Sequence, residues 1–277
     1  MNPLVSVVIP TRDSPENLRR VLTGLDEADW ERIEVVIVDN GGEVSVPTVT
    51  GRLRSLRVLR LAIPFNFPRL INAGVSVSNG DFVLMLNDDV EFTGKRWLAA
   101  MMEHATVPGS GPVGAHLKYP NGSIQHCGMS PSPDGRFLHD LRGAWPDEVA
   151  ARGYDKPRVA VASTGACLLV RRSLFDAVGG LDPLFVSDYN DVDFCLRAEL
   201  HGKKTVVVPT SDVVHHESMT RGTGSGVREL SDWLRFRARW SNQRTGAASP
   251  ELSASGGPNC EMSVQEREGP RGTDGRG

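Results

Sequence analysis

The sequence predicts an α/β fold with a mainly parallel β-sheet, and two observations lead to this prediction. Short runs of β-branched and other apolar residues alternate with segments of helical periodicity, a pattern typical of successive βαβ units. The run at 82–86 is apolar at every position. A strand without polar alternation is normally covered on both faces, as in the middle of a parallel sheet.

The elements expected in the first half follow from local signals. Residues 4–10 have the composition of a strand, and residues 14–28 that of a helix, with Ser14 as N-cap and Pro15 at the first helical position. Four further elements are expected, in this order: strands at 33–40 and 56–62, a helix at 67–78 and a strand at 82–86.

The second half of the chain differs in its pattern of expected elements. A helix is expected at 94–105 and strands joined by an Asn-Gly turn at 112–129. Residues 130–158 are rich in Pro, Gly and charge and are expected to form a long loop. The remaining expected elements are a strand and a helix in 163–182, a helix and a strand in 190–209, an amphipathic helix at 228–240 within the segment 223–244, and a disordered tail at 245–277.

Composition excludes several classes of protein. The chain of 277 residues has 31 basic and 34 acidic side chains, so nothing in its overall charge predicts binding to nucleic acid. Its 4 cysteines are widely separated, which is typical of reduced thiols and not of a disulfide framework or a zinc site. The start of the chain lacks the features of a signal peptide, and no apolar run approaches the ~20 residues that span a bilayer. The expectation is a soluble cytoplasmic protein without a transmembrane segment.

Polar residues follow three of the predicted strands. They are Pro10, Thr11 and Arg12 after the first strand, Asp39 and Asn40 after the second, and Asn87, Asp88 and Asp89 after the run at 82–86. Because ligands of parallel sheets bind outside the carboxyl ends of the strands, these residues are expected along one edge. Adjacent carboxylates repel each other, so solvent, a basic partner or a cation must balance them. An ordinary polar turn is the alternative for each stretch taken alone.

Seven segments together resemble the family 2 glycosyltransferases. In chain order they are "VSVVIPTRDSPENLRRVL", "VIVDN", "INAG", "LNDDVEF", "STGACLLVRRSLFDAVGGLD", "NDVDFCLR" and "HHES". The resemblance runs from about residue 4 to about residue 222 and implies a GT-A fold: a Rossmann-like, mainly parallel sheet flanked by helices, with a small additional sheet on the acceptor side. It implies a catalytic domain at 1–222, with a nucleotide-sugar-binding half at about 1–92 and an acceptor half at about 93–222.

The resemblance also implies an activity. Family members transfer a sugar from a nucleotide-diphosphate donor, here expected to be a UDP- or dTDP-sugar, and generally need Mn²⁺ or Mg²⁺. A hard divalent cation suits this chemistry because it offsets the charge of the departing diphosphate. "GAHLKYPNGSIQHCGM" and "HHESMTRG" further resemble a bacterial branch that builds surface polysaccharides and decorates secondary metabolites. The expected acceptor is therefore a glycan, a lipid-linked sugar or a small molecule.

Donor-side roles are carried over from the family's Asp-x-Asp motif, which "NDD" matches. Asp89 is implied as a metal ligand, Asp88 as a donor-binding residue, and Asn87 as the ribose- or metal-facing first position. Asn87 departs from the usual Asp and lowers the charge of the site. Asp39 matches an acid that binds the nucleobase or ribose, and a helix cap is its alternative.

Other donor-side candidates have plainer alternatives. Pro10, Thr11 and Arg12 lie where the first strand's exit lines the base pocket, although Arg12 could simply be solvated. Asn72, from "INAG", could lie near the diphosphate or serve helix packing. Gly165, in "TGA", is expected on the floor between donor and acceptor.

The acceptor side needs a base, because a neutral alcohol is a poor nucleophile. Asp191 in "NDVD" matches the family's general base, and a single displacement would invert the anomeric centre. The positive end of its helix is expected to hold its pKa down. Asp193 and Arg197 are expected to pair at i and i+4.

A third metal ligand is implied at "HHES". His215 is preferred by its spacing from Asp191, and His216 is the alternative because strand alternation could present either ring. Trp145 could stack on an acceptor sugar or serve packing.

Competing functions fit less well. A sugar-phosphate nucleotidyltransferase would need a glycine-rich basic loop after the first strand, and a phosphatase would need a different carboxylate pattern. A catalytically silent nucleotide-sugar-binding scaffold remains open because of Asn87. The helix at 228–240 is expected to dock on the catalytic domain, with a homodimer contact or the inner face of the membrane as alternatives.

Overall fold

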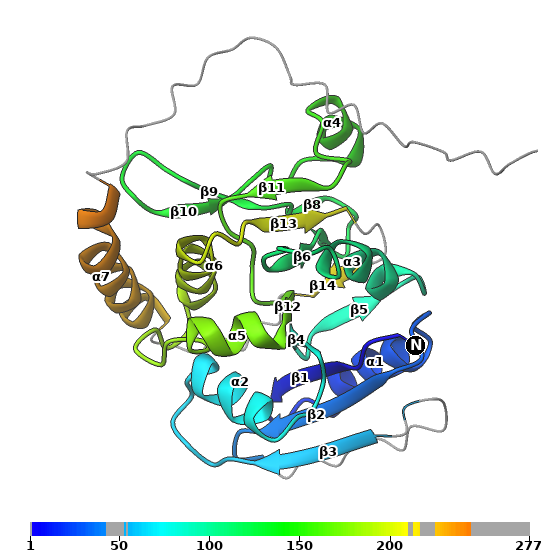
Figure 1. Cartoon of the computed structure of the whole chain (residues 1–277). Coiled ribbons are helices and arrows are strands. Elements are labelled where there is room, and N and C mark those ends of the chain that lie inside the picture. Colours follow the sequence, from blue (N-terminus) through cyan, green and yellow to red (C-terminus); the bar gives the residue numbers. More distant parts are fainter. Residues whose placement is uncertain (1, 43–52, 54, 210–212, 217–224, 245–277) are drawn as a thin grey trace, which may run out of the picture.

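The computed structural model describes residues 2–42, 53, 55–209, 213–216 and 225–244 (Figure 1). It has an α/β fold in which a large twisted sheet is covered by helices on both faces. The tail at 245–277, predicted to be disordered, lies outside the described residues.

The large sheet has eight strands in the order β11-β13-β6-β12-β4-β1-β2-β3. Strands β3, β2, β1 and β4 are mutually parallel, β12 runs antiparallel to both β4 and β6, and β13 is parallel to β6. The bounds are β1 Val5–Thr11, β2 Ile33–Asp39, β3 Ser55–Arg60, β4 Phe82–Leu86, β6 Val113–Ala115, β11 Arg158–Ala160, β12 Cys167–Arg171 and β13 Thr205–Val208.

Two smaller sheets complete the β structure. The first has the order β5-β14-β7-β8, and the second is a β9–β10 hairpin. Their strands are β5 Val90–Phe92, β7 Leu117–Lys118, β8 Ile124–His126, β9 Met129–Pro131, β10 Phe137–His139 and β14 Val213–His215. The four-stranded sheet is the small additional sheet that the family resemblance implied.

Seven helices lie within the described residues. They are α1 Pro15–Asp26, α2 Phe67–Ser76, α3 Trp97–Ala105, α4 Pro146–Ala151, α5 Arg172–Val178, α6 Asn190–Leu200 and α7 Ser225–Arg244. Each helix expected from the sequence is present. Helix α5 ends before Gly179 and Gly180, which both have positive φ, a conformation that favours glycine at a helix C-terminus.

The core lies on both faces of the large sheet. Side chains alternate along the strands: Phe82, Leu84 and Leu86 of β4 pack in one apolar cluster, whereas Val83 and Met85 pack in the other. Helices α1 and α3 contribute to the first cluster, and α2, α5, α6 and α7 to the second. This two-sided burial explains why the run at 82–86 has no polar alternation.

Close packing of α2 on the sheet depends on Gly74. A Cβ at this position would lie 2.3 Å from Val8 Cγ1 and 2.9 Å from Val38 Cγ2, distances that no real contact allows. Gly74 of "INAG" therefore serves helix–sheet packing.

One prediction about the second half is wrong. Residues 130–158 are not a long loop, because they contain most of the β9–β10 hairpin and helix α4, and they end at the start of β11. The strands are only three residues long, so their signal was hidden among the Pro, Gly and charged residues around them.

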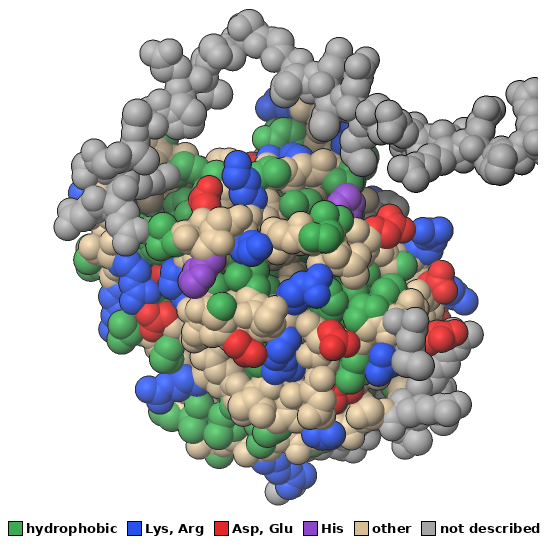
Figure 2. All heavy atoms as spheres, in the orientation of Figure 1, with side chains coloured by type: hydrophobic (Ala, Val, Ile, Leu, Met, Phe, Trp, Pro, Cys, Tyr) green, Lys and Arg blue, Asp and Glu red, His purple; other side chains and the backbone are tan. Residues whose placement is uncertain are grey.

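The described surface mixes charges. On the face in Figure 2, basic and acidic side chains are interspersed, and neither sign covers an extended area. Within the described residues, none of the helices combines the length and hydrophobicity needed to cross a bilayer.

Candidate active site

The carboxyl ends of β1, β2 and β4 bring the predicted donor-side residues to one edge of the sheet. β1 pairs with both β2 and β4 in parallel register. At this edge Thr11 Oγ1 donates a hydrogen bond of 2.6 Å to Asp88 Oδ2. The first strand's exit and the "NDD" motif are therefore in direct contact, as the sheet-edge rule predicts.

Asp89 and His215 are neighbours because of the small sheet. Strand β5 follows Asp89 directly and pairs antiparallel with β14, with His215 opposite Val90. The backbone N–H of His216 also donates to the carbonyl of Asp89, at 3.0 Å. As a result, His215 Nε2 lies 2.9 Å from Asp89 Oδ1 and 3.2 Å from Asn87 Nδ2.

Gln125 of β8 fixes the His215 ring. Its Oε1 lies 2.6 Å from His215 Nδ1, and its Nε2 donates to the His215 carbonyl at 3.4 Å. With Oε1 accepting, Nδ1 carries a proton, and Nε2 is the ring nitrogen that faces Asp89. His216 is directed elsewhere, 2.7 Å from Glu91 Oε2.

This arrangement fits a divalent cation. A carboxylate oxygen and an imidazole nitrogen 2.9 Å apart need a positive charge to hold them together, and either a proton on the ring or a metal ion beside both atoms supplies it. The mixed oxygen and nitrogen donors suit Mn²⁺, and the Gln125 contact is the kind of outer partner that orients ligating histidines. Among the described residues, no group of three or more His, Cys, Asp and Glu side chains is placed to hold a metal ion. A metal ion held here would take two ligands from Asp89 and His215 and the others from phosphate and water oxygens.

Asp88 is in an unusual electrostatic position. Burial raises its pKa to about 6, the Thr11 hydrogen bond opposes this increase, and the neighbouring Asp89 carboxylate adds to it. Negative charge on both Asp88 and Asp89 therefore costs free energy in the protein alone, and a bound cation would lower that cost.

Asp39 is almost fully buried at the end of β2, with 1% of its surface exposed. Its Oδ1 accepts from the backbone N–H of Gly42 at 2.9 Å. Its Oδ2 has no hydrogen-bond partner among the described residues, and the Arg60 Nε atom is 4.0 Å away. A buried carboxylate oxygen without a donor can accept from an imide N–H or a hydroxyl group.

Asp191 lies in the first turn of α6 and faces the segment before β12. Gly165 N donates to its Oδ2 at 2.9 Å, and Val192 N donates to its Oδ1 at 2.8 Å. Burial raises the pKa of Asp191, and these two backbone hydrogen bonds offset only part of the increase. The expectation that the helix end would hold this pKa down is therefore wrong, because desolvation outweighs the helix dipole. A carboxylate with a raised pKa is the stronger proton acceptor.

Four predicted side chains lie in plainer environments. Pro10 is buried within β1. Arg12 is largely exposed and pairs with Asp13 at 3.7 Å. Asn72 donates to the Leu181 carbonyl at 2.7 Å and accepts from its N–H at 3.0 Å, which supports the packing alternative. Trp145 is 57% exposed at the start of α4.

Sequence reasoning assigned no role to Gln125 and His126, although both lie in the quoted "GSIQHCGM". Neighbouring residues of a strand face opposite ways, and these two hold different parts of the site. Gln125 holds His215, whereas buried His126 Nε2 contacts Ser163 Oγ at 2.9 Å and the Thr164 N–H at 3.4 Å, beside Gly165. Their presence in a segment shared with relatives was the available signal.

Asp232 of α7 was also missed. Its Oδ2 accepts from the backbone N–H groups of residues 186, 187 and 188, at 2.9, 3.0 and 3.2 Å. This fully buried carboxylate therefore fixes the loop that leads into Asp191. Nearby, Asp193 accepts from Arg197, Arg239 and Trp240 at 2.7–3.0 Å. The predicted Asp193–Arg197 pair is present. Helix α7 docks on α6 and on the loop before it.

Comparison with known families now adds a second line of support. The model of "Glycosyl transferase family 2" matches residues 6–179, and that of "Glycosyl transferase family group 2" matches residues 122–245. The chain belongs to glycosyl transferase family 2. The resemblance inferred from the seven motifs is thereby confirmed.

Curated relatives of this family 2 chain include three informative proteins. An uncharacterised protein, y4gI of Sinorhizobium fredii, is 40% identical over 79% of the chain but 25% of its own length. The O-antigen biosynthesis protein RfbC of Myxococcus xanthus is 29% identical over 85% of the chain and 19% of its own length. The chain thus spans a quarter or less of these two relatives. The N-acetylglucosaminyl-diphospho-decaprenol L-rhamnosyltransferase of Mycobacterium tuberculosis is 27% identical over 80% of the chain and 79% of its own length.

Solved structures confirm the fold. The mannosyltransferase PcManGT from Pyrobaculum calidifontis, in complex with GDP-Man and Mn²⁺, has a TM-score of 0.62 and 17% identity, covering 87% of this chain and 65% of its own. GalNAc-T7 with UDP, GalNAc and Mn²⁺ has a TM-score of 0.67 and 15% identity, covering 88% and 49%. The GT-A fold expected from the sequence is therefore correct.

Proposed function

We propose that the chain is an inverting, metal-dependent glycosyltransferase that moves a sugar from a UDP- or dTDP-sugar to an acceptor hydroxyl. In this proposal Asp89 and His215 hold Mn²⁺ or Mg²⁺, Asp39 binds the nucleoside, and Asp191 is the general base. Family membership and the fold support transfer from a nucleotide sugar, and the residue roles rest on the site.

The observation that carries the proposal is the pairing of Asp89 Oδ1 with His215 Nε2 at 2.9 Å, with the opposite ring nitrogen held by Gln125. The sequence separates these two residues by more than a hundred positions, and the fold presents their donor atoms side by side. Two structural neighbours were solved in complexes that contain Mn²⁺. When bound, the cation supplies charge stabilisation for the departing diphosphate.

The protein's own residues perform the remaining steps. Asp39 Oδ2 accepts a hydrogen bond from the nucleoside and fixes the donor at the edge of the sheet. The carboxylate of Asp191, oriented by Gly165 and Val192, takes the proton from the acceptor hydroxyl. At the same time, the oxygen of that hydroxyl bonds to the anomeric carbon. Because the acceptor attacks in a single displacement as the diphosphate leaves, the anomeric configuration inverts.

The acceptor class follows the relatives. One relative's name specifies an N-acetylglucosaminyl-diphospho-decaprenol acceptor, and another's specifies O-antigen biosynthesis. We therefore propose a bacterial glycan or lipid-linked sugar as the acceptor, with small molecules as a secondary class. A lipid-linked acceptor would place the enzyme at the inner face of the membrane.

Calorimetric titration tests the donor site directly. UDP, dTDP and GDP are titrated into the protein, each with and without Mn²⁺. Metal-dependent binding of UDP or dTDP is expected. Binding that is equally tight without metal would contradict the metal assignment, and absence of binding by folded protein would contradict the whole proposal.

A further inference from the structure

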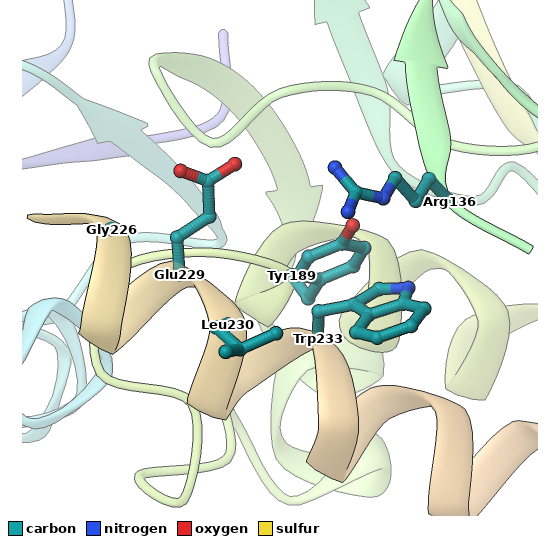
Figure 3. A pocket seen from close by; sticks show the side chains of 6 residues that line it. All are labelled: Arg136, Tyr189, Gly226, Glu229, Leu230 and Trp233. Atoms are coloured by element: carbon teal, nitrogen blue, oxygen red, sulfur yellow. The ribbon is translucent and has the colours of Figure 1, made fainter.

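A pocket of about 190 Å³ lies between helix α7 and the segment that begins α6. Figure 3 shows it from close by. It is lined by Arg136, Tyr189, Gly226, Glu229, Leu230 and Trp233. These residues come from the turn before β10, the residue before α6, and the first turns of α7, and none belongs to the donor site described above.

The size of the pocket limits its occupant. Sites for drug-sized molecules measure roughly 300–1,000 Å³, so a space of about 190 Å³ suits a single ring of six atoms with its substituents. A whole nucleotide sugar or an extended oligosaccharide does not fit within it.

The lining suits a ring that carries hydroxyl groups. Arg136 offers guanidinium donors beyond the one that pairs with Asp134 at 3.3 Å, and Glu229 offers carboxylate acceptors. Figure 3 shows the Tyr189 hydroxyl beside the Arg136 guanidinium, with the Glu229 carboxylate on the other side of the pocket. Leu230 and the two aromatic rings supply apolar surface. Sugar rings present hydroxyl groups at their rim and C–H groups on their faces, and both find partners here.

Trp233 contributes its indole ring to the wall of the pocket. Its Nε1 is shielded from solvent and has no hydrogen-bond partner among the described residues. A nitrogen that solvent does not reach is equally closed to a hydroxyl group in the pocket, so the contribution of Trp233 is the apolar surface of its ring.

Several contacts fix the residues around the pocket to the loop at 186–188, which leads into α6. Asp232, next to Trp233, accepts from three backbone N–H groups of 186–188. The Tyr189 ring packs on Phe236 of α7, with ring centroids 4.9 Å apart, and Arg136 lies over the Trp233 ring at 5.3 Å. Tyr189 itself adopts a left-handed conformation (φ 61°) immediately before α6. The pocket therefore adjoins the helix whose second residue is Asp191.

We propose that Arg136, Tyr189, Glu229 and Trp233 form an acceptor subsite that binds one hexopyranosyl ring. This inference rests on the proposed function, because it assigns the pocket to the sugar that receives the transferred residue or to the ring next to it. We assign the pocket to the acceptor and not to the donor sugar because it shares no residue with the edge of the sheet where the nucleotide is proposed to bind.

Saturation-transfer NMR tests the subsite with defined probes: the methyl glycosides of glucose, galactose, mannose, rhamnose and N-acetylglucosamine. The wild-type chain is expected to transfer saturation to at least one of them. Glu229→Gln is expected to weaken that binding about ten- to hundredfold from the charged hydrogen bonds removed, and Trp233→Ala about three- to tenfold from the ring surface removed. Arg228→Gln, a charge change on the same helix outside the pocket lining, is the matched control and is expected to leave binding unchanged.

Two further measurements separate the possible failures. Thermal unfolding of each variant shows whether the fold is kept, and nucleotide titration with Mn²⁺ reports on the donor site. If nucleotide binds but no glycoside shows transfer, or if a bound glycoside is unaffected by both pocket variants, the subsite is refuted while the proposed function stands. If glycosides bind through these residues but no nucleotide binds, the proposed function fails and the sugar site stands.

Discussion

Replacing Gln125 by Met should weaken metal binding, although it changes neither of the proposed ligands, Asp89 and His215. Gln125 is buried, with 4% of its surface exposed, and its Oε1 lies 2.6 Å from His215 Nδ1. Met has a similar length and fills the same space but cannot accept that hydrogen bond with comparable strength. His215 would then lose both the partner that sets its tautomer and the contact that fixes its ring.

The expected magnitude follows from these two losses. A neutral hydrogen bond contributes about 1 kcal/mol, and a ring free to occupy other rotamers adds an ordering cost of ~1 kcal/mol on binding. Together about 2 kcal/mol correspond to roughly thirtyfold weaker affinity, because about 1.4 kcal/mol is tenfold. This value lies within the roughly ten- to hundredfold range typical of partners that orient metal ligands.

The assay is a Mn²⁺ titration at saturating nucleotide, in which electron paramagnetic resonance reports the free ion. Gln125→Glu keeps the acceptor and is expected to bind Mn²⁺ at least as well as the wild type. His216→Ala is the ligand control and is expected to have little effect, since His216 contacts Glu91. If folded Gln125→Met binds Mn²⁺ with wild-type affinity, the role of Gln125 is refuted. If His216→Ala loses much of its Mn²⁺ affinity, the metal ligand is His216 and not His215.

Three further predictions concern α6. Asp191→Asn is expected to abolish transfer and leave nucleotide binding close to wild type; unchanged turnover would contradict the base assignment. Because burial raises the pKa of Asp191 and a base must be ionised, kcat should fall on acidification, with its midpoint above the ordinary aspartate value of about 3.9; a pH–rate profile that stays flat down to that value would contradict this. Asp193→Ala leaves Arg239 without one of its partners and should lower the free energy of unfolding by about 3–5 kcal/mol; at ~2–4 °C per kcal/mol, a melting temperature within 3 °C of wild type would be the contrary result.

Local patterns were sufficient for most strands of the large sheet and for the edge where the predicted donor-side residues lie. The uninterrupted apolar run at 82–86 predicted a doubly covered strand, and its side chains do divide between two clusters. The sheet-edge rule then brought Thr11 and Asp88 together, and they are joined by a hydrogen bond. Such predictions succeed because the residues of a short segment are enough to indicate whether a strand is buried and in which direction it runs.

The other side of the site depends on pairings that short segments do not display. Strands β5 and β14 have three residues each and are far apart in the chain, yet their register decides that His215 and not His216 reaches Asp89. The spacing from Asp191 favoured His215, but strand alternation in the sequence left His216 as an alternative. The same reason explains the missed β9–β10 hairpin, whose strands are equally short. Distant pairing of short strands is set by the completed fold and not by local propensity.

Helix α7 shows how buried polar groups decide which face of an amphipathic helix docks. The helical period puts Leu230, Trp233, Leu234 and Trp240 on one side of α7, but Leu230 and Leu234 are about half exposed. The buried face instead centres on Asp232, Phe236 and Trp240. Asp232 holds three N–H groups of the loop before Asp191, and Trp240 donates to Asp193. A rotation that buried both leucines would expose Asp232 and leave those N–H groups without an acceptor, a cost that two leucine side chains cannot offset. The helix therefore docks through its charged residues, and its orientation places Trp233 beside the residues that enter α6.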